Sequence, residues 1–156
     1  MSATHLHLMF NHLPVFGSAI AIVLLAWALW ARSRDLTRAG LILTLVCGAG
    51  GLVARQTGHE AEEQIEDLPW AQRELIHEHE EAADLAFILL GVAGLAAAVA
   101  LVRMRGDKPA RVETMIVLAL VTVGFAVTAD AALDGGKIRH EEIRPGFVLP
   151  AGEHDD

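Results

Sequence analysis

The side chains in this sequence that could hold a cofactor are its eight histidines, because imidazole is the group that most often binds metal ions and haem iron. They form three groups along the 156 residues: three before residue 13, three between residues 59 and 79, and two after residue 139. Long apolar segments separate these groups, so the chemistry depends on how those segments are arranged. The histidines are His5, His7, His12, His59, His77, His79, His140 and His154.

Four apolar runs define the elements that must position these histidines: residues 14–31, 39–54, 82–102 and 112–133. A helix that is apolar on all sides is either deeply buried or surrounded by lipid, and this chain is too short to bury four such helices in water. A membrane span needs about 20 apolar residues, which three runs provide and the second nearly provides. We therefore predict an all-α fold, in which residues 1–156 form a single integral membrane domain and the four spans form an up-down bundle.

Charge predicts the orientation of these spans. With four crossings, both termini and the connection between the second and third spans share one face, which then carries all eight histidines. The other two connections hold seven bases and three acids, a net charge of +4, whereas the histidine face holds five bases and seventeen acids, a net charge of −12. Short connections rich in Lys and Arg stay in the cytoplasm. We therefore expect the N-terminus, the C-terminus and the histidines outside, on the periplasmic side of a Gram-negative cell.

The connection between the second and third spans, residues 57–81, is expected to be an acidic, extramembrane helical segment. Thr57 and Glu60 have the spacing of a capping box, which predicts a short helix over residues 58–67. Pro69 then favours the first turn of a new helix, and nothing breaks the helical pattern from there into the third span.

Glycines have two expected roles. Gly135 and Gly136 predict the end of the fourth helix, since glycine readily adopts the left-handed conformation of a helix cap, and residues 145–156 follow as a polar tail. Within the spans, small residues such as Gly48 and Gly94 either let helices approach closely or leave room for a flat macrocycle. Close packing is the more common use, and we expect it here.

His77 and His79 are distinguished by the residues that share their helical faces. Three- and four-residue steps from His79 reach Ala83 and Ala86, a small apolar face that should point into the bundle. The same steps from His77 reach carboxylates, including Asp84, which indicates a polar face. His79 is therefore the better candidate for an inward ligand, and His77 is retained as a weaker metal ligand.

Two further histidines join His79 as predicted cofactor or metal ligands. His12 lies where the first span begins, and His140 follows the double glycine after the fourth span. His59, at the end of the second span, is a weaker metal candidate. A neighbouring carboxylate could orient any of these imidazoles, as is common around bound metals. The remaining histidines are expected to be solvated: His5, His7 and His154.

Four short segments, in this order and spacing, resemble an uncharacterised bacterial family of four-helix inner-membrane proteins, the domain of unknown function 2231. The similarity covers residues 6–144. The segments that carry it are NHLP (Asn11–Pro14), TGHEAEEQIEDLP (Thr57–Pro69), HEEAADLA (His79–Ala86) and GGKIRHEEI (Gly135–Ile143).

This resemblance implies a multi-pass protein of the bacterial inner (cytoplasmic) membrane, with outward histidines at the positions of His12, His79 and His140. Many relatives have glutamate at the position of His59, which argues against an essential ligand there. Some relatives are joined to c-type cytochrome domains, which implies electron-transfer surroundings. The family has no established activity, so the resemblance bears on the fold more than on the function.

Three functions remain open. The first is a b-type haem protein for electron transfer near the outer face, with His12 and His79 as axial ligands and His140 as the alternate. The second is a zinc, copper or iron site, in which these three histidines and a carboxylate or water bind the ion. The third is a cofactor-free structural or docking subunit, whose acidic face binds a basic periplasmic cytochrome or another redox subunit.

The other expected partners follow from composition. The lipid bilayer is the first of them, and further copies of the chain are compatible with the sequence. No nucleic-acid surface, phosphate loop or nucleophile triad is present in the sequence. Enzymatic activity is neither indicated nor excluded.

Overall fold

The computed structural model describes residues 2–104 and 110–148. Of the predicted tail over residues 145–156, residues 149–156 lie outside the described residues, and His154 is among them. Within the described residues the structure is helical and contains no strand, which confirms the all-helical prediction. The elements are α1 (Ala3–Phe10), α2 (His12–Ala31), α3 (Arg34–Ile65), α4 (Arg73–Arg103), α5 (Arg111–Arg139) and the 3-10 turn η1 (Glu141–Ile143).

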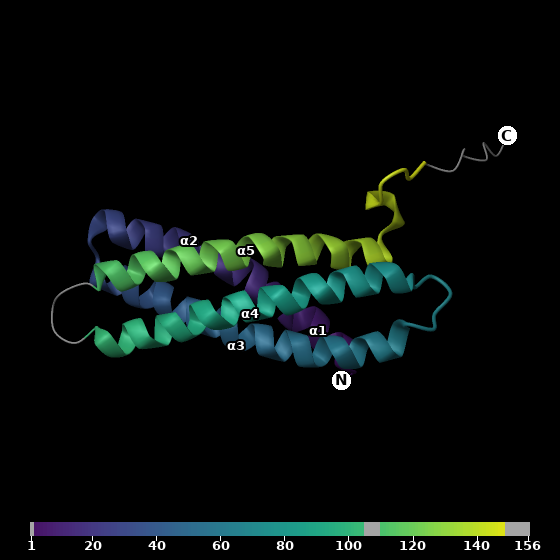
Figure 1. The fold of residues 1–156 in the computed structure, drawn as a ribbon, viewed down its shortest axis with the longest axis horizontal. Coiled ribbons are helices and arrows are strands. Elements are labelled where there is room, and N and C mark those ends of the chain that lie inside the picture. Colours follow the sequence, from purple (N-terminus) through teal and green to yellow (C-terminus); the bar gives the residue numbers. More distant parts are fainter. Residues whose placement is uncertain (1, 105–109, 149–156) are drawn as a thin grey trace.

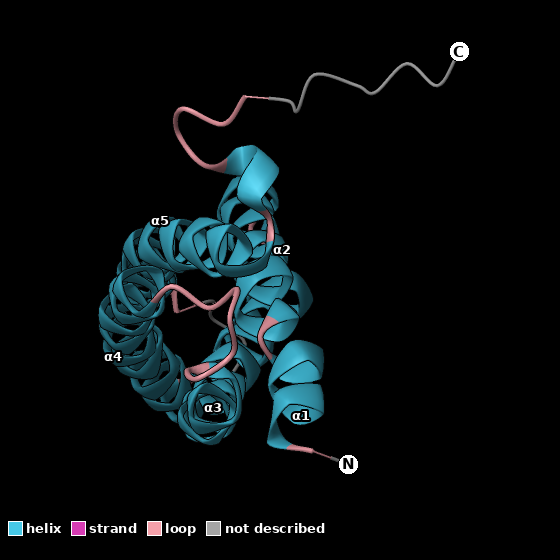
Figure 2. Ribbon diagram, turned by 90° about the vertical axis from the view of Figure 1, so that its right-hand side faces the viewer, coloured by secondary structure: helices cyan, strands magenta, loops and turns pink. Residues whose placement is uncertain are grey.

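The four long helices lie side by side and alternate in direction (Figure 1). Helices α2 and α4 each contact both α3 and α5, whereas α3 and α5 contact each other little. Figure 2 shows α1 outside this arrangement, alongside α3 and α2. One end of the molecule carries α1, residues 66–72 and η1, and we call it the histidine end. The opposite end carries the α2–α3 connection and the start of α5, and we call it the arginine end.

All four long helices are long and apolar enough to cross a membrane. Each of the four apolar runs predicted as spans lies inside one of them. Large apolar side chains cover their outer surfaces; Trp30 of α2, for example, is 83% exposed and Leu95 of α4 is 69% exposed. Such a surface is costly in water and favourable in lipid.

A proline separates α1 from α2. Proline has no N–H group to donate, and its ring clashes with the carbonyl group four residues earlier in a helix. For Pro14 that carbonyl belongs to Phe10, where α1 ends. Beyond this break α1 continues along α3, where Thr4 donates a hydrogen bond to Gln64.

Helix α3 continues through the segment where a separate short helix was predicted, so that prediction was wrong. The Thr57 hydroxyl does not cap a new helix but donates to the carbonyl of Val53 at 2.8 Å within the same helix. Nothing between residues 54 and 65 removes a backbone donor, so the helical hydrogen bonds continue. A turn follows, and α4 begins at Arg73 instead of near Pro69.

Helix α5 likewise runs through Gly135 and Gly136 to Arg139, and the predicted helix end at the glycines was wrong. A Cβ atom on Gly135 would lie 2.9 Å from the ring of His79, and one on Gly136 would lie 3.2 Å from Ile143. These glycines remain helical and make room for neighbouring side chains.

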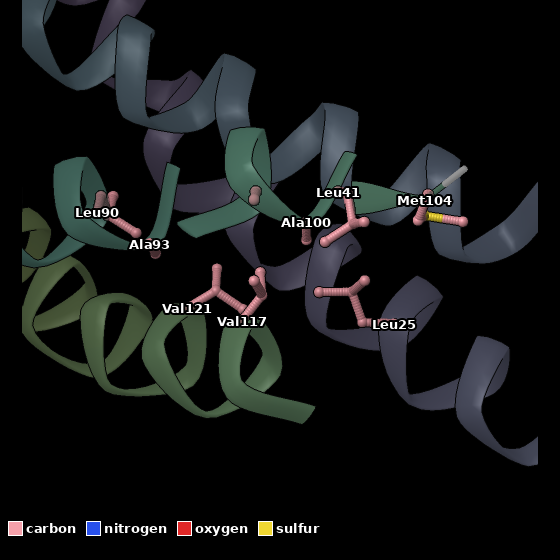
Figure 3. Packing of buried hydrophobic residues seen from close by; sticks show 9 residues of the cluster. Leu25, Leu41, Leu90, Ala93, Ala100, Met104, Val117 and Val121 are labelled. Atoms are coloured by element: carbon pink, nitrogen blue, oxygen red, sulfur yellow. The ribbon is translucent and has the colours of Figure 1, made fainter. Parts of the chain in front are cut away.

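The core is formed by small and branched apolar residues between the long helices (Figure 3). Close helix contacts also involve glycine: a Cβ atom on Gly48 of α3 would lie 2.9 Å from the carbonyl oxygen of Leu90 on α4. One on Gly94 would lie 3.5 Å from the Cα atom of Gly48. These two glycines serve close packing, as predicted. The largest fully buried apolar side chains of the core cluster are Leu25, Leu41, Leu90, Val117 and Val121.

Candidate metal centre at the histidine end

The three histidines predicted as ligands occupy three separate places. His12 is exposed, donates from Nδ1 to the carbonyl of Leu8 at 2.9 Å and stacks on Phe16. His140 is exposed and hydrogen-bonds through Nδ1 to the carboxylate of Glu142 at 2.8 Å. Among the described residues, His12, His79 and His140 do not gather into a group with metal-binding spacing.

His79 faces a neighbouring helix, as its apolar stripe predicts. Its Nδ1 atom lies 2.8 Å from the carbonyl oxygen of Ala131 on α5, and its ring packs where a Cβ on Gly135 would otherwise lie. His77, in contrast, is exposed and lies 3.3 Å from the carboxylate of Glu81 one turn later. The structure therefore decides which of the two histidines points inward.

The ring beside His79 belongs to His7, which was expected to be solvated; that expectation was wrong. His7 is partly buried because α1 lies against α3, where its Nδ1 atom is 2.9 Å from the carbonyl oxygen of Ala54. A Cβ on Gly58 would lie 3.1 Å from the His7 ring. The centroids of the two imidazoles are 6.3 Å apart and their planes meet at 83°. We call His7 and His79 the histidine pair.

The hydrogen bonds of the histidine pair define the state of each ring. A backbone carbonyl oxygen can only accept, so Nδ1 of each ring carries the hydrogen. In a neutral imidazole, Nε2 then keeps the lone pair that binds metal ions. Metal-binding histidines usually donate their other N–H group to a carboxylate or backbone carbonyl, which fixes the tautomer and the ring orientation. Both rings of the pair have this arrangement.

Sequence reasoning missed His7 because its surroundings come from another part of the chain. One local signal was present: Ala3 and His7 are four residues apart and share a face of α1, and Ala3 is buried. A buried alanine in line with a histidine would have suggested that this face contacts the rest of the protein.

One ion pair and two cation–ring contacts tie the helices together at the histidine end. The guanidinium of Arg55 on α3 donates to both carboxylate oxygens of Asp84 on α4, at 2.7 and 3.1 Å. It also lies 5.6 Å from the ring centroid of Phe87. The guanidinium of Arg139 lies 4.3 Å from the centroid of Trp70, which joins the end of α5 to the α3–α4 connection.

A second group of possible ligands lies on the surface between α3 and α4. Donor atoms of His59, Glu62 and Glu80 all lie within 4.8 Å of one another, and no other group of three or more is found among the described residues. The His59 side chain is 73% exposed. Glu62 and Glu80 are partly exposed, and water competes with a metal ion for their carboxylates, so this group is a weaker site than one built on oriented imidazoles.

The C-terminal turn has its own electrostatic arrangement. Hydrogen bonds from the backbone amide of Glu142 and from the His140 ring lower the pKa of the Glu142 carboxyl group. This contact holds the His140 ring against η1.

The function must be argued from this geometry. No protein-family model, curated protein or solved structure matches the chain. The resemblance to the domain of unknown function 2231 rests on four short segments and stays a prediction.

Proposed function

We propose that this chain is a multi-pass membrane protein that binds a transition-metal ion at its outer face through Nε2 of His7 and Nε2 of His79. The observation that supports the proposal is the histidine pair itself: two adjacent imidazoles, each with Nδ1–H donated to a backbone carbonyl. Imidazole suits zinc and copper among the first-row metals. Two protein ligands leave further coordination positions to water, a carboxylate or a bound substrate.

The membrane arrangement in this proposal is an up-down bundle in the bacterial inner membrane, with the histidine end outside. Its support is the apolar outer surface of the four helices, together with the net charge of +4 on the connections at the arginine end. The histidine face has a net charge of −12, and a surface of one sign raises the local concentration of counter-ions. Cations are therefore attracted towards the pair.

An ion fits the surroundings of the pair better than haem does. A porphyrin coordinated by two histidines needs a flat slot between helices. Here the spaces over Gly58 and Gly135 are filled by the imidazole rings themselves, and the glycines of α3 and α4 bring their backbones into contact further along. Gly58 and Gly135 thus make room for the imidazoles, and Gly48 and Gly94 let α3 and α4 pack too closely for a porphyrin to fit between them. The predicted haem protein for electron transfer becomes the alternative that the experiment must separate.

The test is metal binding by the purified chain in a mild detergent, after removal of metals with a chelator. We expect one equivalent of Zn²⁺, or of Cu⁺ supplied with a competing copper chelator, to bind in calorimetric and competition titrations. His7→Ala and His79→Ala should each lower the affinity by roughly 100-fold or more, because loss of a ligand exceeds the 10–100-fold effect of losing an outer partner. His12→Ala and His140→Ala are matched controls that should bind like the unaltered chain.

Several results would overturn the proposal. Binding that survives in the His7→Ala/His79→Ala double variant but is lost in His59→Ala would assign the ion to the surface group. A Soret band that disappears in His79→Ala, after expression with ample haem, would assign a haem instead. Failure to bind either ion would leave the cofactor-free docking role.

A further inference from the structure

A hollow at the arginine end, distant from the histidine pair, has the features of an anion site. It lies between α2, α3 and α5 and has a volume of about 190 Å³. One water molecule occupies roughly 30 Å³ of liquid volume, so the hollow has room for a group the size of a phosphate. Its walls are Ala28, Leu29, Arg32, Thr37, Arg111 and Thr114.

The arginines are the donors that this hollow offers to a ligand. Thr37 and Thr114 are buried, at 3% and 1% exposure, and their hydroxyl groups donate to backbone carbonyls four residues earlier. Their hydrogens are therefore already used. Arg32 and Arg111 are exposed, and among the described residues neither forms an ion pair with a carboxylate. Two guanidinium groups at one hollow can bind phosphate through paired hydrogen bonds.

The backbone of Arg32 supports a role for its side chain. Arg32 follows the last residue of α2 and has φ 51° and ψ 35°. Among the described residues, it is the one non-glycine residue with a positive φ. Glycine adopts this left-handed conformation without the steric cost that any other L-residue has. An arginine here bears that cost and lines the hollow.

The helix ends around the hollow attract anions, and nearby tryptophans indicate a membrane depth. The hollow lies at the first turns of α3 and α5, where the backbone dipoles of a helix favour an anion; each of these turns also carries one carboxylate, Asp35 and Glu113. Trp27 and Trp30, near the end of α2, are 54% and 83% exposed. Exposed tryptophans are enriched at the headgroup level of a bilayer, and Arg32 follows Trp30 by two residues.

We infer that this hollow binds a phosphate group through Arg32 and Arg111, and that an anionic lipid headgroup supplies it. Basic pockets between membrane helices commonly bind phospholipid headgroups, and Ala28 and Leu29 offer an apolar wall to the adjoining glycerol and acyl carbons. The inference shares the membrane location with the proposed function but does not depend on the metal. Free inorganic phosphate carries the same group and is the other candidate ligand for these two arginines.

The experiment follows thermal unfolding of the purified full chain in dodecyl maltoside, with phosphatidylglycerol, phosphatidylcholine or inorganic phosphate added. We expect phosphatidylglycerol to raise Tm and phosphatidylcholine to leave it unchanged. Arg32→Gln and Arg111→Gln should each shift the midpoint of the phosphatidylglycerol titration to roughly tenfold higher concentration or more, because each removes hydrogen bonds from a charged donor. Arg38→Gln is the control, since Arg38 is an exposed base at the same end that does not line the hollow.

Arg32→Gly separates binding from folding. Glycine relieves the left-handed backbone, so this variant should have a higher Tm than the unaltered chain in detergent alone, yet respond weakly to phosphatidylglycerol. If inorganic phosphate at the same concentration raised Tm as much as phosphatidylglycerol does, the ligand would be free phosphate and the lipid would be overturned as the source. An unchanged response in both Arg32→Gln and Arg111→Gln, or an equal loss in Arg38→Gln, would overturn the site.

Discussion

Replacing Gly135 with alanine tests how the histidine pair is held, because the new methyl group would meet His79 directly. Its Cβ atom would lie 2.9 Å from Cε1 and 3.1 Å from Nδ1 of that ring. The imidazole is rigid and is bonded at 2.8 Å to the carbonyl of Ala131, so it must rotate or move away. Gly136→Ala is the matched control: it is the next residue of α5, and its Cβ would meet the terminal carbon of Ile143 at 3.2 Å.

The two substitutions should have opposite effects on stability. Alanine in place of glycine inside a helix gains about 1 kcal/mol, and Gly136→Ala should keep most of this because the end of an isoleucine side chain moves easily. Gly135→Ala has the same gain, but a lost hydrogen bond costs about 1 kcal/mol and overpacking costs about 1–3 kcal/mol. Relative to Gly136→Ala, we expect Gly135→Ala to be less stable by about 2–4 kcal/mol.

Metal affinity gives the sharper measurement. A ring that loses its carbonyl partner loses its fixed tautomer and orientation, and such outer contacts are worth about 10–100-fold in affinity. Isothermal titration of Zn²⁺ into both variants, in the same detergent, should therefore show weaker binding for Gly135→Ala and unchanged binding for Gly136→Ala. Equal affinities in the two variants would refute the claim that the Ala131 carbonyl orients His79.

Three further predictions concern the rest of the structure. Gly48→Ala should destabilise the chain by about 1–3 kcal/mol in detergent unfolding, because its Cβ would meet the backbone carbonyl of Leu90 at 2.9 Å. The control Gly91→Ala, whose Cβ meets nothing within 4 Å, should be neutral or stabilising. A change in stability of the same sign in both variants would contradict the close helix contact. Removing the half-exposed Arg55–Asp84 ion pair by double substitution should change Tm little, because water screens exposed ion pairs, and it should leave Zn²⁺ affinity unchanged. A large loss of affinity would show that this ion pair supports the metal centre. Zn²⁺ affinity should fall as the pH is lowered, because protons compete with the ion for the Nε2 lone pairs. Affinity that does not change down to about pH 5 would exclude imidazole ligands.

The sequence predicted the helices and the end of the molecule that carries the histidines, because both follow from local composition. Apolar runs indicate helices whether or not their neighbours are known, and the alternation of runs and polar segments places the histidines together. The inward direction of His79 also follows from a local pattern, since the residues on its helical face lie within a few turns.

Helix ends were predicted less well, because the same residue types serve more than one purpose. Thr57 and Glu60 fit a capping box, yet the hydroxyl of Thr57 is equally satisfied inside a helix. Gly135 fits a helix cap, yet its use is to make room for the ring of His79. Which use prevails depends on the segment that packs against it, and the local sequence does not contain that segment.

The histidine pair and the arginine hollow were decided by the tertiary structure. The contacts that orient His7 and His79 join residues 47 and 52 positions apart in the chain, and the hollow takes one arginine from the end of α2 and one from the start of α5. Composition and periodicity report the environment that a helix prefers. The partner of each imidazole or guanidinium depends instead on which helices become neighbours and at what height, and that is settled by the packing of distant segments against one another.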